Sequence, residues 1–200
     1  MITALELIMP KLEELYNTRV RHYVVKKHTL LVCEQFEKYA FAFDNKCMNM
    51  DLMRLVLAIH DIGKAIDRST QHEHTLSLVR ELWENTPFTE HEFNLVEVLL
   101  RDDHLGLYFQ NKYKLSDLKE EIVANATELK MSPSILLQYK MILYQCDIAS
   151  YTKDVGGLKY LEHMFVYENG EKAFDEENGI IAMSEEYADR YVNLKESINE

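Results

Sequence analysis

The sequence of 200 residues is poor in cysteine, glycine and proline. Its three cysteines, Cys33, Cys47 and Cys146, are an odd number without Cys-x-x-Cys spacing, so neither a disulfide framework nor a zinc ribbon is indicated. A reducing cytoplasm is therefore the expected compartment. Six glycines and three prolines leave long segments without a break, and apolar residues recur at steps of three and four. This pattern favours helices.

Long apolar runs and an excess of basic residues are also missing. No stretch approaches the roughly 18 apolar residues of a membrane span, and the first 19 residues contain Glu6, Glu13 and Glu14, unlike a signal peptide. The 22 Lys and Arg are outnumbered by 34 Asp and Glu, which gives a net charge of −12. This charge opposes long-range attraction to DNA or RNA. We expect a cytoplasmic protein that acts on a small substrate, with neither a membrane nor a long nucleic acid as its partner.

The length and the helical periodicity predict one all-α domain over residues 1–200. A chain of this length can bury about 70% of its unfolded surface, and no linker divides it. The expected helices are 3–16, 20–41, 49–66, 74–84, 90–105, 116–129, 133–151 and one that begins after Ser184.

Local signals support several of these boundaries. Asn49 or Asp51 is a candidate N-cap, and Thr89 with Glu92 forms a capping box. Ser132-Pro133 is an N-cap followed by a first-turn proline. Asn169-Gly170 is the pair that favours a type I′ turn, so it predicts a small C-terminal hairpin between residues 165–168 and 171–174.

Two ionisable residues lie within apolar helical stripes. His28 shares a helix face with Val24, Val25, Leu31 and Val32, and Asp147 follows the apolar run 135–143. Burying a lone carboxylate costs several kcal/mol, so Asp147 must be paired, protonated or bound to a cation. With histidines available, a metal ion is the simplest partner.

The segment Leu57 to Lys64 adds His60 and Asp61. Lys64 follows His60 by four residues and Asp61 by three, on the same side of a helix. Imidazoles together with carboxylates suit a divalent Mn, Fe, Co, Ni or Zn ion, and Mg also stays open. His74 and His104 are expected to point inward as well, which would allow a second metal. The sequence does not choose between one ion and two, or among the metals.

The order His28, His60-Asp61, Asp147 resembles the H…HD…D motif of the HD-domain superfamily of metal-dependent phosphohydrolases. The resemblance covers about residues 20–151 and leaves a C-terminal extension, about residues 152–200. It implies an HD-type helical bundle in which these four residues bind metal. The form His60-Asp61-Ile62-Gly63-Lys64, with histidines at 74 and 104, is similar to the dinuclear subset. This subset includes HD-GYP phosphodiesterases, diadenosine tetraphosphate hydrolases and the HD region of bacterial tRNA nucleotidyltransferases, which the spacing to His74 resembles most.

The sequence also departs from several members of this superfamily. No GYP signature follows His104, and Gly63-Lys64 replaces the Glu-Asp pair of stringent-response hydrolases. In the dinuclear subset of the superfamily, the histidines between the HD pair and the last aspartate bind the second metal. Here His72 competes with His74 for that role, and Asp103 competes with His104.

The resemblance implies hydrolysis of a phosphomonoester or phosphodiester of a nucleotide or another small phosphorylated metabolite. A metal would lower the pKa of the attacking water, Asp61 would be a ligand at the reacting centre, and Lys64 would offset charge on the phosphoryl group. Two alternatives stay open: a non-catalytic nucleotide-binding HD module, and a di-iron oxygenase resembling myo-inositol oxygenase. The substrate and the oligomeric state are not indicated.

Overall fold

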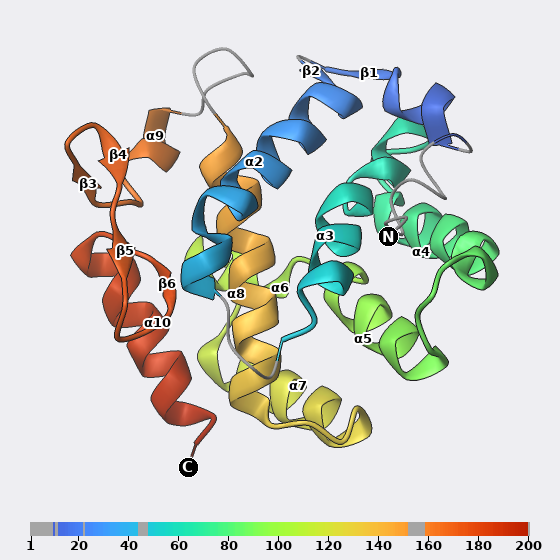
Figure 1. Cartoon of the computed structure of the whole chain (residues 1–200). Coiled ribbons are helices and arrows are strands. Elements are labelled where there is room, and N and C mark those ends of the chain that lie inside the picture. The colour runs from blue at the N-terminus through green and yellow to red at the C-terminus, as the bar shows by residue number, and fades with distance from the viewer. Residues whose placement is uncertain (1–9, 11, 22, 44–47, 152–158, 200) are drawn as a thin grey trace.

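The computed structural model describes residues 10, 12–21, 23–43, 48–151 and 159–199, and it confirms the all-α class. Figure 1 shows helices throughout, with short strands at the periphery. The helices are α2 Val25–Phe43, α3 Met50–Ile59, α4 Gln71–Leu82, α5 Glu90–Leu100, α6 His104–Phe109, α7 Leu115–Glu128, α8 Pro133–Ser150, α9 Lys159–Glu162 and α10 Glu185–Ser197, with 3₁₀ turns η1 Ile62–Ala65 and η2 Trp83–Asn85.

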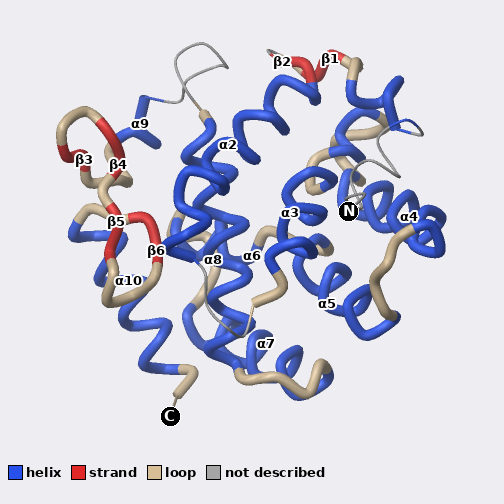
Figure 2. The backbone as a smooth tube through the Cα atoms, in the orientation of Figure 1, coloured by secondary structure: helices blue, strands red, loops and turns tan. Residues whose placement is uncertain are grey.

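The strands form three antiparallel pairs of two residues each (Figure 2). They are β1 Arg19–Val20 with β2 Tyr23–Val24, β3 Tyr167–Glu168 with β4 Glu171–Lys172, and β5 Phe174–Asp175 with β6 Ile180–Ile181. None of the described helices combines the length and the apolar character that a membrane crossing requires.

Helix α8 lies at the centre of the molecule, against α2, α3 and α7 (Figure 1). Its buried residues point in every direction around the helix, which is the pattern of a helix enclosed by others. The fully buried Val32 and Phe36 of α2 and Ile142 of α8 belong to this core. An ionisable side chain on the inner part of α2 or α8 is therefore held away from water.

The predicted helix over residues 20–41 begins later, at Val25, so its expected start was wrong. The preceding residues form the β1–β2 hairpin, with Arg21 at φ 51° in the turn and the Val25 amide donating to the Thr18 carbonyl. The β-branched and aromatic residues of these strands favour an extended backbone. His28 consequently sits in the first turn of α2 rather than at its middle.

The predicted helix over residues 49–66 has the expected Asn49 cap but breaks after Ile59. The chain turns at Asp61, whose φ of −107° and ψ of 2° are not helical, and continues as η1. Gly63 explains the break, because its amide donates to Thr75 Oγ1 and an added Cβ would lie 2.0 Å from the Gln71 carbonyl oxygen. The close approach of η1 to α4 thus ends the helix at the His60-Asp61 pair.

The helix expected over residues 90–105 also ends early, at Leu100, and α6 follows after a short loop. In this loop Asp102 Oδ1 accepts the His104 amide, and the Asp103 carboxylate packs where a Cβ on Gly106 would lie. Short acidic side chains that approach nearby backbone in this way compete with helix continuation. The break places Asp102 and Asp103 beside α8.

The other boundaries agree closely with expectation. The Thr89–Glu92 capping box, α7, α8 and α10 are confirmed, and so is the hairpin, in which Asn169 and Gly170 both have positive φ. The helix predicted for 74–84 starts three residues earlier, at Gln71. Most of the first predicted helix, 3–16, lies outside the described residues.

Candidate metal centre

Four of the predicted ligands meet at one place, and we name them the central cluster: His28, His60, Asp61 and Asp147. α2 supplies His28, α8 supplies Asp147, and the break between α3 and η1 supplies the other two. His28 Nε2 lies 3.0 Å from Asp147 Oδ1 and 3.3 Å from Asp61 Oδ2. His60 Nε2 lies 3.5 Å from Asp147 Oδ1 and 3.6 Å from Asp61 Oδ1.

The atoms that face the middle of the central cluster lack aligned partners. Nε2 of His28, Nε2 of His60 and Oδ1 of Asp147 are buried without a hydrogen bond. They lie within 4.8 Å of one another. Buried polar atoms of this kind are normally paired, because an unpaired one costs about 1–3 kcal/mol. Three such atoms aimed at one point could hold a divalent metal ion.

The opposite ring nitrogens of the two histidines are oriented by the protein. His60 Nδ1 lies 2.7 Å from the Leu57 carbonyl oxygen, so it donates there and leaves Nε2 with its lone pair. His28 Nδ1 lies 3.3 Å from Ser150 Oγ, which in turn donates to the Asp147 carbonyl. Metal-binding histidines are commonly oriented in this way. The lone pair of His60 Nε2 thus faces the cluster.

Charge within the cluster keeps both carboxylates ionised. Burial raises the pKa of Asp61 and of Asp147, but the neighbouring histidines outweigh it, together with Lys64 at Asp61, and hold both values well below the usual range. Burial lowers the pKa of His28, yet the adjacent carboxylates of Asp147 and Asp61 raise it to about 9. The protein therefore presents the buried carboxylate of Asp61 and the partly exposed carboxylate of Asp147, which attract positive charge, whether a proton on His28 or a metal ion.

Lys64 lies at the edge of the central cluster. Its Nζ donates to the Asp61 carboxylate at 2.6 Å, and Tyr23 donates to the same carboxylate at 3.2 Å. Burial lowers the pKa of Lys64, but Asp61 and Asp147 outweigh this effect and raise it above its usual value. Lys64 is thus a fixed cation beside the cluster.

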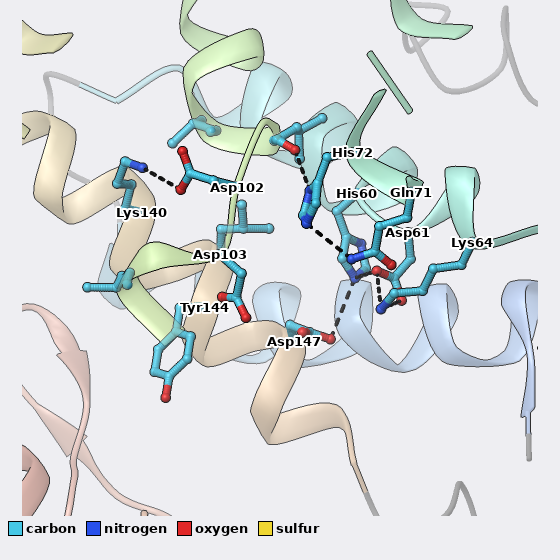
Figure 3. Close-up of a pocket in the computed structure, with 14 residues that line it drawn as sticks. His60, Asp61, Lys64, Gln71, His72, Asp102, Asp103, Lys140, Tyr144 and Asp147 are labelled. Atoms are coloured by element: carbon cyan, nitrogen blue, oxygen red, sulfur yellow. Dashed lines mark hydrogen bonds and ion pairs between the residues drawn. The ribbon is translucent and has the colours of Figure 1, made fainter. Parts of the chain in front are cut away.

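A pocket opens from this edge of the cluster (Figure 3). It holds about 680 Å³ of empty space including its open mouth. The polar residues that line it are His60, Asp61, Lys64, Gln71, His72, Asp102, Asp103, Lys140, Tyr144 and Asp147. The central cluster is therefore open to a small ligand on one side.

The structure does not bring His74 and His104 to this pocket; it places their alternatives, His72 and Asp103, in the lining. His72 Nδ1 lies 2.8 Å from the Leu100 carbonyl oxygen. Because α4 begins at Gln71 and residues two apart in a helix point about 200° apart, His72 and His74 cannot share one face. Much of the Asp103 residue is exposed, but burial of its carboxyl group and the nearby charge of Asp147 raise its pKa to about 6.

His104 belongs to a second group, the outer cluster, which consists of Asp102, His104, Glu121 and Lys140. His104 Nδ1 lies 2.6 Å from Glu121 Oε2, and its ring stacks on Tyr113. Lys140 Nζ lies 3.3 Å from Glu121 Oε1 and 3.7 Å from Asp102 Oδ1. The outer cluster thus contains its own cation.

Several polar residues of the site were not among the predicted ones: Tyr23, Gln71, Asp102, Lys140 and Ser150. Lys140 precedes Asp147 by seven residues, two turns of α8, which places the two on one face. This spacing could have revealed Lys140 from the sequence. Tyr23 carried no such signal, because it reaches Asp61 only through the unexpected β1–β2 hairpin.

Comparisons of this chain with protein-family models, curated proteins and solved structures give no match. The interpretation of the site therefore rests on its own residues.

Proposed function

We propose that this chain is a metal-dependent phosphohydrolase of the HD type, which cleaves a phosphate ester of a nucleotide or another small phosphorylated metabolite. One observation carries the proposal. His28 Nε2, His60 Nε2 and Asp147 Oδ1 converge without hydrogen-bond partners beside an open pocket. The order of these residues in the sequence, with Asp61 after His60, is that of the H…HD…D motif.

In this proposal the central cluster holds one divalent ion. A bound divalent ion supplies a water of lowered pKa and offsets charge on the phosphoryl oxygens. His28 and His60 offer neutral nitrogens to it, and Asp61 and Asp147 offer carboxylates that stay ionised because of their basic neighbours. The proposal allows for a second ion, for which His72 and Asp103 in the pocket lining are candidate ligands.

Lys64 positions Asp61 and adds positive charge beside the phosphate. Its raised pKa keeps it protonated at neutral pH, and its contact with Asp61 fixes the ammonium group at the pocket wall. A preorganised cation of this kind stabilises charge that develops on a transferring phosphoryl group. The proposal also places the protein in a reducing cytoplasm, because its three cysteines show no pattern typical of a disulfide framework.

The test is a screen of phosphomonoesters and phosphodiesters with the full chain, first freed of metal and then loaded with Mn²⁺ or another divalent ion. We expect metal-dependent release of phosphate or of a phosphomonoester. Asp61→Ala should lower this activity by roughly a thousandfold or more, since it removes a group at the reacting centre. Asp189→Ala changes an exposed aspartate of α10 and is the matched control, expected to keep full activity.

Circular dichroism of the Asp61→Ala protein shows whether the helices persist. Undiminished hydrolysis in this variant would overturn the proposal. Two bound irons with oxygen consumption and no hydrolysis would favour the oxygenase alternative instead.

A further inference from the structure

A second cavity adjoins the central cluster on the side away from Lys64. It shares Asp103, Tyr144 and Asp147 with the pocket of Figure 3, and it holds about 640 Å³ of empty space including its opening. The two cavities therefore meet at Asp147, a member of the central cluster. A molecule whose phosphate lies at the cluster could extend into either of them.

The walls of this second cavity are mainly aromatic and apolar, and we name it the aromatic lobe. The residues that define it are Phe109, Gln110, Tyr144, Tyr151, Met164 and Tyr187. Phe109 stacks on Tyr144 with ring centroids 5.0 Å apart and an interplanar angle of 12°, and Tyr187 lies 6.3 Å from Phe109. Such walls suit a flat ring, with the exposed Gln110 as a polar group at the lobe.

The C-terminal extension builds one wall of the lobe. This wall consists of Leu161 of α9, Met164 of the segment after α9, and Tyr187 of α10. The buried side-chain amide of Gln145 on α8 donates to the Ile181 carbonyl and accepts from the Ile181 amide, at 2.7 and 2.9 Å. This pairing fixes the extension to the helix that carries Asp147, so the wall and the central cluster share one support.

The Lys64 side of the first pocket and the aromatic lobe differ in charge. The end of the first pocket away from Lys64 contains Asp102 and Lys140, which interact within the outer cluster. Among the described residues that line the aromatic lobe there is no lysine or arginine, and its carboxylates are Asp103 and Asp147, at the junction. A phosphate is therefore favoured on the Lys64 side, and an uncharged ring is favoured in the lobe.

We propose that the aromatic lobe binds the nucleobase of a nucleotide substrate, which leaves with the nucleoside when the phosphate ester is cleaved. The C-terminal extension thereby sets substrate specificity. The inference rests on the proposed hydrolysis for its link to turnover, but the binding of the ring does not depend on a metal. Stacking of a base on aromatic side chains is sequence-tolerant, because every base has a π-face. The lobe is thus expected to distinguish a nucleotide from a sugar phosphate more strongly than it distinguishes one base from another.

The first experiment compares adenosine 5′-monophosphate with ribose 5-phosphate, which differ only in the base, on the metal-loaded full chain. We expect kcat/KM for the nucleotide to be at least about fivefold higher, the low end of what one stacked base contributes. Tyr187→Ala should remove most of this advantage through KM, and Tyr187→Phe should retain it because the ring remains.

Two further variants separate a role in the lobe from a role in packing. Tyr167→Ala changes an exposed tyrosine of β3, outside the lobe but in the same extension, and should leave both substrates unaffected. Gln110→Ala changes an exposed residue of the lobe, so folding should be unaffected. A rise in KM for the nucleotide alone of roughly threefold, as for one lost hydrogen bond, is expected. Equal kinetics for the two phosphates in the wild-type protein would overturn the inference.

The second experiment measures binding of adenosine, which has no phosphate, to the metal-free full chain by calorimetry. Adenosine binding that Tyr187→Ala weakens and Tyr167→Ala does not would support the lobe even if no phosphate ester were hydrolysed. Hydrolysis of both phosphates without a base preference and without adenosine binding would overturn the lobe and leave the proposed function standing.

Discussion

The central cluster and the outer cluster both combine histidine with carboxylates but differ in what remains unpaired. In the outer cluster His104 and Glu121 pair with each other, and Lys140 supplies the positive charge that two carboxylates require. In the central cluster, Nε2 of both histidines and one oxygen of Asp147 have no aligned partner. The metal site that we propose is therefore at the central cluster, where these ligand atoms have no hydrogen-bond partner.

Helix α8 contributes to both clusters and accounts for much of the difference. It supplies the cation Lys140 to the outer cluster and, two turns later, the carboxylate of Asp147 to the central cluster. Lys64, the lysine at the central cluster, contacts Asp61 at its edge, and Nε2 of each histidine has no hydrogen bond. The lysine of the outer cluster lies between its two carboxylates, whereas Lys64 lies at the edge of the central cluster, against Asp61.

The largest expected effect concerns metal affinity. His60→Ala should weaken Mn²⁺ binding by at least about a hundredfold, because it removes one of the converging nitrogens. His104→Gln should leave the affinity and the number of bound ions unchanged. Titration calorimetry on the metal-free proteins measures both. Loss of a bound ion in His104→Gln would break the distinction between the clusters.

Removal of Lys140 tests whether the outer cluster is compensated by its own chain. Lys140 is only 5% exposed, and Lys140→Met would leave Asp102 and Glu121 without their shared cation. We expect a loss of roughly 3 kcal/mol in the free energy of unfolding, measured by urea denaturation. Lys112→Met, at an exposed position, should change it by less than about 0.5 kcal/mol. Equal stability of the two variants would contradict the assignment.

Gly63 tests the turn that presents His60 and Asp61. A methyl group there would lie 2.0 Å from the Gln71 carbonyl oxygen and 2.6 Å from Thr75 Oγ1, so η1 and α4 must separate. Gly63→Ala should destabilise the protein by about 1–3 kcal/mol and also weaken Mn²⁺ binding. A variant with normal stability and normal metal affinity would show that this close approach does not position the central cluster.

The smallest effect is expected from His104→Gln on stability. The His104 side chain is 36% exposed and its ion pair with Glu121 is open to solvent, so its loss should cost less than about 1 kcal/mol. The urea midpoint checks this. A loss of several kcal/mol would indicate that His104 holds the outer cluster together, which the structure attributes to Lys140.

The residues of the central cluster could be predicted because each carries a local signal. His28 and Asp147 are ionisable residues on apolar helix faces, and the His60-Asp61 pair has a recognisable sequence. The position of His72 rather than His74 in the pocket lining could not be predicted, since it depends on where α4 begins. The helix break at Asp61 depends on the contact between Gly63 and Thr75, which are distant in sequence.

The pairing of Lys140 with Glu121 was equally hidden. The two residues lie on α8 and α7, and each looks like an ordinary helical residue in its own segment. The helices and the C-terminal hairpin followed from periodicity, caps and turn residues, which act within a few positions. The β1–β2 hairpin escaped prediction because the apolar residues of 20–25 fit a helical period as well as a strand.

The most direct test of a metal in the central cluster is a crystal structure of the full chain soaked with Mn²⁺, with anomalous scattering recorded near the manganese absorption edge. We expect a peak bounded by His28 Nε2, His60 Nε2 and Asp147 Oδ1. A peak found instead between Asp102, His104 and Glu121, or no peak at the central cluster, would contradict the account.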